Sequence, residues 1–89
     1  MMLSKHLEAF IKAHEAYPGT KRGLKTEWDL LVKKHKDWRE AVFDLYPAIM
    51  LTVAWKKKLA KRNEFVPCWP HMKTWLNQRR WEEAETYDV

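Results

Sequence analysis

The sequence predicts an all-α protein, a single small bundle of four to five short helices. Apolar residues recur at helical spacing, and no stretch of five or more residues alternates convincingly with period two. Only two glycines and four prolines interrupt the 89 residues. The chain also carries six tryptophans, three tyrosines and three phenylalanines. Because each packed aromatic side chain buries on the order of 150–250 Å², so small a chain can form a compact core without a disulfide or a metal.

Two helices are predicted in the N-terminal third. Ser4 is an N-cap residue for the first, whose buried stripe follows helical spacing at Leu7, Phe10, Ile11 and His14. Residues 17–19, Tyr-Pro-Gly, end it. The second helix begins between Thr20 and Gly23 and is basic and amphipathic. Its apolar face consists of Leu24, Trp28, Leu31, Val32 and His35.

The middle of the chain allows two interpretations. In the first, Asp37 caps a third helix that ends before Pro47, and Pro47 opens a fourth helix to about Arg62. The apolar face of the third helix is Trp38, Ala41, Val42 and Leu45, and that of the fourth is Ala48, Leu51, Thr52, Trp55 and Leu59. In the second interpretation, residues 37–62 form one helix that Pro47 bends.

A short connection and a last helix follow. Asn63 suits the C-terminal end of the preceding helix, and residues 65–69 are expected to be extended. Pro70 then opens a short helix from His71 to about Asn77.

Charge is distributed unevenly along the chain. The net charge is +5, yet the last eight residues carry four carboxylates and no Lys or Arg. Residues 1–81 therefore hold 17 basic and 8 acidic groups, a net charge of +9. We expect a helical domain over residues 1–81 and an acidic, flexible tail over residues 82–89. A basic body favours a polyanionic partner through counterion release.

Several classes of function are not expected. Cys68 and His71 form a C-x-x-H pair, but no second cysteine exists to complete a zinc site. With two glycines the chain has no nucleotide-binding glycine motif. Residues 45–55 are the longest uncharged stretch, far short of the roughly 20 residues that cross a membrane. The N-terminus does not resemble a signal peptide. We therefore expect a cytoplasmic protein without catalytic activity, metal or cofactor, and with no membrane partner.

Basic groups and two tryptophans are the candidate nucleic-acid-binding residues. Trp28, Trp38, Trp55 and Trp75 follow helical periodicity and are expected in the core. Trp69 and Trp81 do not, and are the candidates for stacking on bases, with a structural role as the alternative. The predicted set is Lys21, Arg22, Lys25, Lys57, Lys58, Lys61, Arg62, Lys73, Arg79, Arg80, Trp69 and Trp81. The alternative for Arg80 is an ion pair with carboxylates of the tail.

Three motifs carry a resemblance to a known module. They are F-x-x-A-x-x-x-Y-P at residues 10–18, K-R-G-L-K-T-E-W at residues 21–28, and F-V-P-x-W-P-H-M-K-T-W-L-N-Q-R-R-W-E-E at residues 65–83. Together they resemble a small helical module of bacteriophage and prophage replication proteins, of the initiator, replisome-organiser or primosomal helicase-loader type. The matching positions are Tyr17, Pro18, Trp28, Pro67, His71, Thr74, Trp75, Leu76, Asn77, Arg80 and Trp81. Most of them are expected to define the fold.

The resemblance implies a role in DNA replication. The chain departs from the pattern by inserting residues 68–70 between the expected Pro and His and by lacking the winged helix that usually precedes the module. These departures argue against reading duplex DNA. We expect a replication accessory domain that binds nucleic acid, with single-stranded DNA favoured. The alternatives are a module that docks onto a replicative helicase or initiator protein without contacting DNA, and an inert remnant of a longer protein. The sequence leaves the oligomeric state open.

Overall fold

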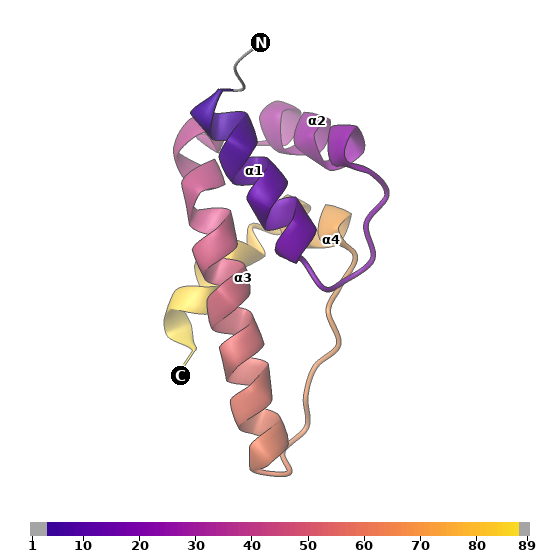
Figure 1. The fold of residues 1–89 in the computed structure, drawn as a ribbon, viewed down its shortest axis with the longest axis vertical. Helices are drawn as coiled ribbons and strands as arrows, with labels where there is room; N and C mark the ends of the chain where they lie inside the picture. Colours follow the sequence, from indigo (N-terminus) through magenta and orange to yellow (C-terminus); the bar gives the residue numbers. More distant parts are fainter. Residues whose placement is uncertain (1–3, 88–89) are drawn as a thin grey trace.

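A computed structural model describes residues 4–87 and confirms the all-α class (Figure 1). Four α-helices are followed by one 3₁₀ helix, and the described residues contain no strand. The elements are α1 (Lys5–Ala16), α2 (Leu24–Lys34), α3 (Trp38–Lys61), α4 (Met72–Asn77) and η1 (Arg80–Thr86). Ser4 caps α1 as predicted, because its Oγ accepts a hydrogen bond from the Leu7 amide at 3.1 Å.

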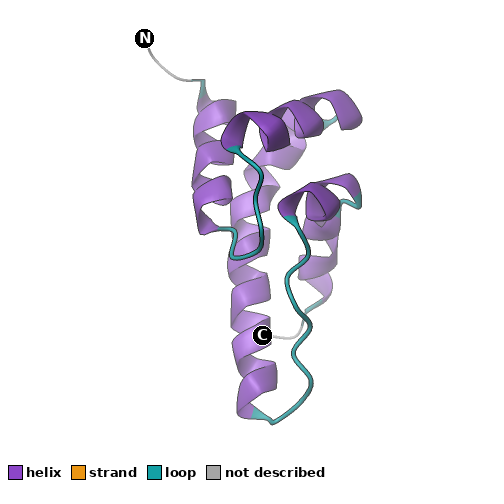
Figure 2. Cartoon of the chain, turned by 90° about the vertical axis from the view of Figure 1, so that its right-hand side faces the viewer, coloured by secondary structure: helices purple, strands orange, loops and turns teal. Residues whose placement is uncertain are grey.

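The long helix α3 is the axis on which the other elements assemble. Its 24 residues give a length of about 36 Å at 1.5 Å per residue. α1 and η1 pack against α3, whereas α2 packs mainly against α4. The C-terminal part of α3 extends beyond α1, and residues 62–71 return alongside it to reach α4 (Figures 1 and 2).

α3 runs through Pro47 without a break, so the prediction of two separate helices is wrong and the single-helix alternative is right. A proline inside a helix costs about 3 kcal/mol. Three side chains of α3, Val42, Leu45 and Ile49, are fully buried, and each contributes on the order of 1.5–3 kcal/mol. Their burial outweighs the proline penalty, and Pro47 itself is exposed.

The core joins every helix. Its largest fully buried apolar side chains are Phe10, Leu31, Val42, Leu45, Ile49, Met72 and Leu76. Trp75 is also buried, as predicted, while Trp28 and Trp38 are partly buried and pack against the core. Trp55 is partly exposed and stacks on Tyr87 with ring centroids 4.1 Å apart. Leu51, which was expected on the apolar face, is exposed.

The segment expected to be a flexible acidic tail is partly helical. Residues 82–86 belong to η1, and Ala84 is buried against α3 together with Trp81. Trp81, Ala84 and Tyr87 are spaced by three residues, which places them on one side of a 3₁₀ helix. The helical domain therefore extends to Tyr87, with the carboxylates of Glu82 and Glu83 on exposed residues. The last two residues of the expected tail lie outside the described residues.

Replacing Ile49 by alanine should lower the free energy of unfolding by about 2–5 kcal/mol, because it leaves a cavity in the core. Urea denaturation measures the change. Phe65→Ala is the matched control, since Phe65 is 84% exposed, and should change stability by less than about 0.5 kcal/mol. Equal losses for the two variants would contradict this placement of the core.

Candidate nucleic-acid interface

A basic hollow of about 370 Å³ lies between α2 and α4. It is lined by Arg22, Thr26, Asp29, Leu30, Lys33, Lys34 and Lys73. Four cationic side chains and one carboxylate leave three net positive charges at this place. The carboxylate, Asp29, also forms an exposed ion pair with Lys25 at 3.0 Å. The hollow therefore presents a concentrated positive charge from two helices, which suits an anionic ligand.

A buried carboxylate fixes the start of α2. Glu27 is 0% exposed, and its Oε1 accepts hydrogen bonds from the backbone amides of Arg22 and Gly23 at 3.2 and 3.0 Å. His14 Nε2 lies 3.0 Å from the same oxygen. A buried carboxylate without such donors would cost several kcal/mol. Glu27 thereby ties α2 to α1 and holds the backbone of Arg22 at the edge of the basic hollow.

The turn after α1 positions α4 and therefore Lys73. The Met72 amide donates a hydrogen bond to the Thr20 carbonyl at 2.9 Å, and the Tyr17 hydroxyl donates to the Pro70 carbonyl at 2.5 Å. A Cβ at Gly19 would lie 2.5 Å from the Pro70 oxygen, so this close approach requires glycine. The sequence Tyr-Pro-Gly of the first motif thus holds the beginning of the third.

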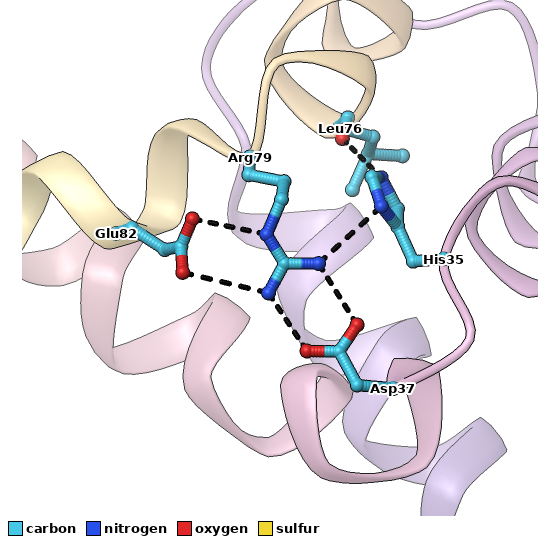
Figure 3. A network of polar contacts seen from close by, with 5 residues as sticks. All are labelled: His35, Asp37, Leu76, Arg79 and Glu82. Carbon is cyan, nitrogen blue, oxygen red and sulfur yellow. Dashed lines mark hydrogen bonds and ion pairs between the residues drawn. The ribbon is translucent and has the colours of Figure 1, made fainter.

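Arg79 does not face solvent as a free phosphate ligand (Figure 3). Its Nη1 and Nη2 donate to the two oxygens of Asp37 at 2.8 and 2.7 Å, and its Nε donates to Glu82 at 2.9 Å. The hydrogen bond from Arg79 holds the pKa of Asp37 below its usual range, and the same contact raises the pKa of Arg79. Paired carboxylates thus occupy the guanidinium group that was predicted to bind nucleic acid.

His35 completes this Arg79 network of His35, Asp37, Arg79 and Glu82. Its Nε2 lies 2.8 Å from the Leu76 carbonyl, and its Nδ1 lies 3.4 Å from Arg79 Nη1. A carbonyl oxygen only accepts, so the hydrogen is on Nε2 and Nδ1 is the acceptor for Arg79. Asp37 stands at the N-cap of α3 as predicted, but its side chain makes no cap hydrogen bond because Arg79 holds it.

Trp81 is also removed from the candidate surface. It is 4% exposed and its ring lies edge-on to His35 with a centroid separation of 5.4 Å. A base cannot stack on a ring that the core already encloses. Among the described residues Arg80 forms no ion pair with Glu82, Glu83 or Glu85, and its Nε donates to Gln78 at 2.8 Å.

Trp69 and Arg80 line a second hollow, the aromatic pocket, of about 220 Å³. It lies where residues 67–70 meet α3, α4 and η1, and its aromatic walls are Trp55, Trp69, Trp75 and Tyr87. The Lys56 ammonium lies 5.0 Å from the Trp69 ring centroid and donates to the Pro67 carbonyl. Burial lowers the pKa of Lys56. Trp69 stays partly exposed, so it remains a stacking candidate.

The other predicted cations are not gathered in one place. Lys21 donates from Nζ to the His14 carbonyl at 2.8 Å, and so supplies a hydrogen-bond donor to a backbone carbonyl in the last turn of α1. Lys25 stands beside the basic hollow, on its partner Asp29. Lys57, Lys58, Lys61 and Arg62 belong to the C-terminal end of α3 and line neither hollow. Only Arg22 and Lys73 of the predicted set line the basic hollow.

Sequence reasoning missed Lys33 and Lys34, which supply two of the four cations. Within α2, Thr26, Asp29 and Lys33 follow steps of three and four residues, as do Leu30 and Lys34, which places them on one helix face. That spacing was the available signal. It did not reveal that α4 would dock beside this face and add Lys73.

Within residues 4–87 no group of three or more His, Cys, Asp or Glu side chains is arranged to hold a metal ion, and Cys68 is an exposed free thiol. No helix in the described part of the chain is long and apolar enough to span a membrane.

No protein-family model, curated protein or solved structure matches the chain. The similarity to phage replication modules therefore stays a prediction.

Replacing Tyr17 by phenylalanine should lower the free energy of unfolding by about 1–3 kcal/mol, because the partly buried Pro70 carbonyl loses its donor. Thermal and urea unfolding measure the change. Tyr46→Phe is the control, since the described residues show no hydrogen bond from the Tyr46 hydroxyl. A Tyr17→Phe variant as stable as the control would contradict the role assigned to this contact.

Asp37→Asn should destabilise the protein at pH 7 but not in acid. The pKa of Asp37 is lowered in the folded state, so its contribution is present above the unfolded pKa of about 3.9 and is lost as pH falls through the folded pKa. Urea midpoints of the wild type and the variant, measured from pH 7 down to about pH 3, should therefore converge below about pH 4. A difference that does not depend on pH would show that the ion pair is not its cause.

Proposed function

We propose that the chain is a non-catalytic nucleic-acid-binding domain that holds phosphates in the basic hollow between α2 and α4. The observation that carries the proposal is the convergence of Arg22, Lys33, Lys34 and Lys73 around one depression. All four residues are exposed. Cationic side chains on phosphates release condensed counterions, and this release supplies most of the affinity of sequence-independent binding.

The large net positive charge of the chain supports a polymeric ligand. Residues 1–81 have a net charge of +9, and the hollow alone gathers four cationic side chains. A single phosphate would neutralise only part of the charge in the hollow. A strand with one negative charge per nucleotide can engage several of these groups at once.

Single-stranded DNA is the favoured form of the ligand. α4 has only six residues, which is short for a helix that reads bases in the major groove. Trp69 is partly exposed beside Lys56 and Arg80, an arrangement that suits an unstacked base. The similarity to phage replication modules supports a place in DNA replication.

Docking onto a protein is the second candidate function. The observation that favours it is the exposed apolar surface of α3, where Phe43 is 48% exposed. A helicase or initiator is the partner that the resemblance suggests.

Removing two cations of the hollow should weaken binding and its salt dependence together. Fluorescence anisotropy of labelled single-stranded and duplex oligonucleotides, titrated at several salt concentrations, compares the wild type with Lys33→Ala/Lys73→Ala. We expect the slope of log K against log salt to fall by about 1–2, as two phosphate contacts are lost. Tighter binding of the single strand is expected.

Lys5→Ala/Lys12→Ala is the control with the same change in net charge. Both lysines are exposed on α1, away from the hollow, so the slope should stay close to that of the wild type. Equal losses for the two double variants would reduce the effect to total charge. An absence of wild-type binding at low salt would overturn the proposal.

A further inference from the structure

The outer face of α3 exposes a continuous apolar stripe. Steps of three and four residues place its members on one side of the helix. They are Phe43, Pro47, Met50, Leu51 and Ala54. Phe43 is 48% and Met50 38% exposed. Large apolar side chains that are exposed next to one another mark an interaction surface more often than isolated ones do.

The stripe lies opposite the core. At 3.6 residues per turn, its centre is about half a turn away from the buried residues of α3, which are Ala41, Val42, Leu45, Ala48, Ile49 and Thr52. α1 and η1 both pack on α3, yet the stripe stays exposed. The His6 ring of α1 lies 5.2 Å from the Phe43 ring and η1 borders Pro47 and Leu51, but no element of residues 4–87 covers the stripe.

Opposite charges flank the stripe at its two ends. Glu40 and Asp44 are exposed on the N-terminal side, and Lys57 and Lys61 are exposed on the C-terminal side. Arg39 stands among the acidic residues with its charged guanidinium over the Trp38 ring at 4.7 Å, so these three residues keep one net negative charge. Along its length the face is thus acidic, apolar and then basic. Such a surface is complementary to itself when one copy is reversed.

A small hollow beside the stripe adds to the acidic end. It measures about 90 Å³, lies between α3 and η1, and is lined by Asp44, Pro47, Ala48, Leu51, Trp81, Ala84 and Glu85. An apolar floor with carboxylates at its rim fits a lysine, whose methylene chain packs on apolar surface while its ammonium reaches the carboxylates. The basic end of a reversed copy carries lysines of this kind.

We propose that two copies of the chain associate through this face, with their α3 helices antiparallel. A twofold axis near Met50 and Leu51 brings the two apolar stripes together. It also sets the acidic end of each helix against the basic end of the other. The interface is isologous, so each favourable contact occurs twice. The basic hollow between α2 and α4 is formed by other helices, and both copies keep it accessible.

Sedimentation equilibrium of the whole chain between about 1 and 200 µM tests the proposal. The wild type should reach the dimer mass, and the dissociation constant should rise at least tenfold in Met50→Glu, about 1.4 kcal/mol, because a charge is buried at the axis. Phe65→Glu is the matched control, since it places the same charge on a residue that is 84% exposed and lies outside α3. It should leave the dimer intact.

Exchanging the charges at the two ends of the face distinguishes antiparallel pairing from non-specific association. Glu40→Lys/Asp44→Lys should weaken the dimer, and so should Lys57→Glu/Lys61→Glu, because each set opposes like charges across the interface. The fourfold variant restores opposite charges and should recover affinity to within a few fold of the wild type. Circular dichroism of each variant confirms that α3 is folded.

A wild type that stays monomeric at 200 µM would overturn the proposal and leave the face to a different protein. Association unaffected by Met50→Glu, or a fourfold variant weaker than both twofold variants, would also overturn it. None of these results bears on the basic hollow. Loss of DNA binding in Lys33→Ala/Lys73→Ala concerns the hollow alone, so the two proposals fail separately.

Discussion

The ion pair between Arg79 and Asp37 is the contact on which the arrangement of the C-terminal half depends. It joins the turn between α2 and α3 to the turn between α4 and η1, 42 residues apart in the sequence. Arg79 adopts the left-handed conformation with φ of 51°, which costs on the order of 1–2 kcal/mol. Its charge-assisted hydrogen bonds to Asp37 and Glu82 hold the side chain in this conformation. They fix the turn from α4 into η1, while the Met72–Thr20 and Tyr17–Pro70 hydrogen bonds hold the start of α4.

Local signals predicted much of the fold. The Ser4 cap, the helical periodicity of α1 and α2, and the buried Trp75 were all readable because each depends on residues a few positions apart. Pro47 misled the prediction, since its helix-breaking tendency is a local property and the burial that outweighs it comes from tertiary packing. Residues 82–86 misled it in a similar way. Their carboxylates suggested a solvated tail, while Ala84 among them and Tyr87 directly after them pack on the domain.

The candidate site was less predictable because its members meet only in the tertiary structure. The residues next to Asp37 predict an N-cap at this position. No local signal indicates that its carboxylate will instead form an ion pair with Arg79. Paired arginines beside a tryptophan suggested a phosphate-binding surface, yet the fold places Trp81 inside and pairs Arg79 with carboxylates. The basic hollow instead combines the outer side of α2 with the first turn of α4. Charge alone indicated a polyanion but not where it would bind.

The central claim is that the C-terminal motif is structural and that the ligand binds in the separate basic hollow. Nuclear magnetic resonance tests this claim most directly. A labelled single-stranded oligonucleotide is titrated into ¹⁵N-labelled protein at low salt, and backbone and indole shifts are followed. We predict changes concentrated around Arg22, Lys33 and Lys73, with the Trp81 indole and the Arg79 side chain unperturbed. Changes concentrated at Arg79 and Trp81, with none along α2, would contradict the account.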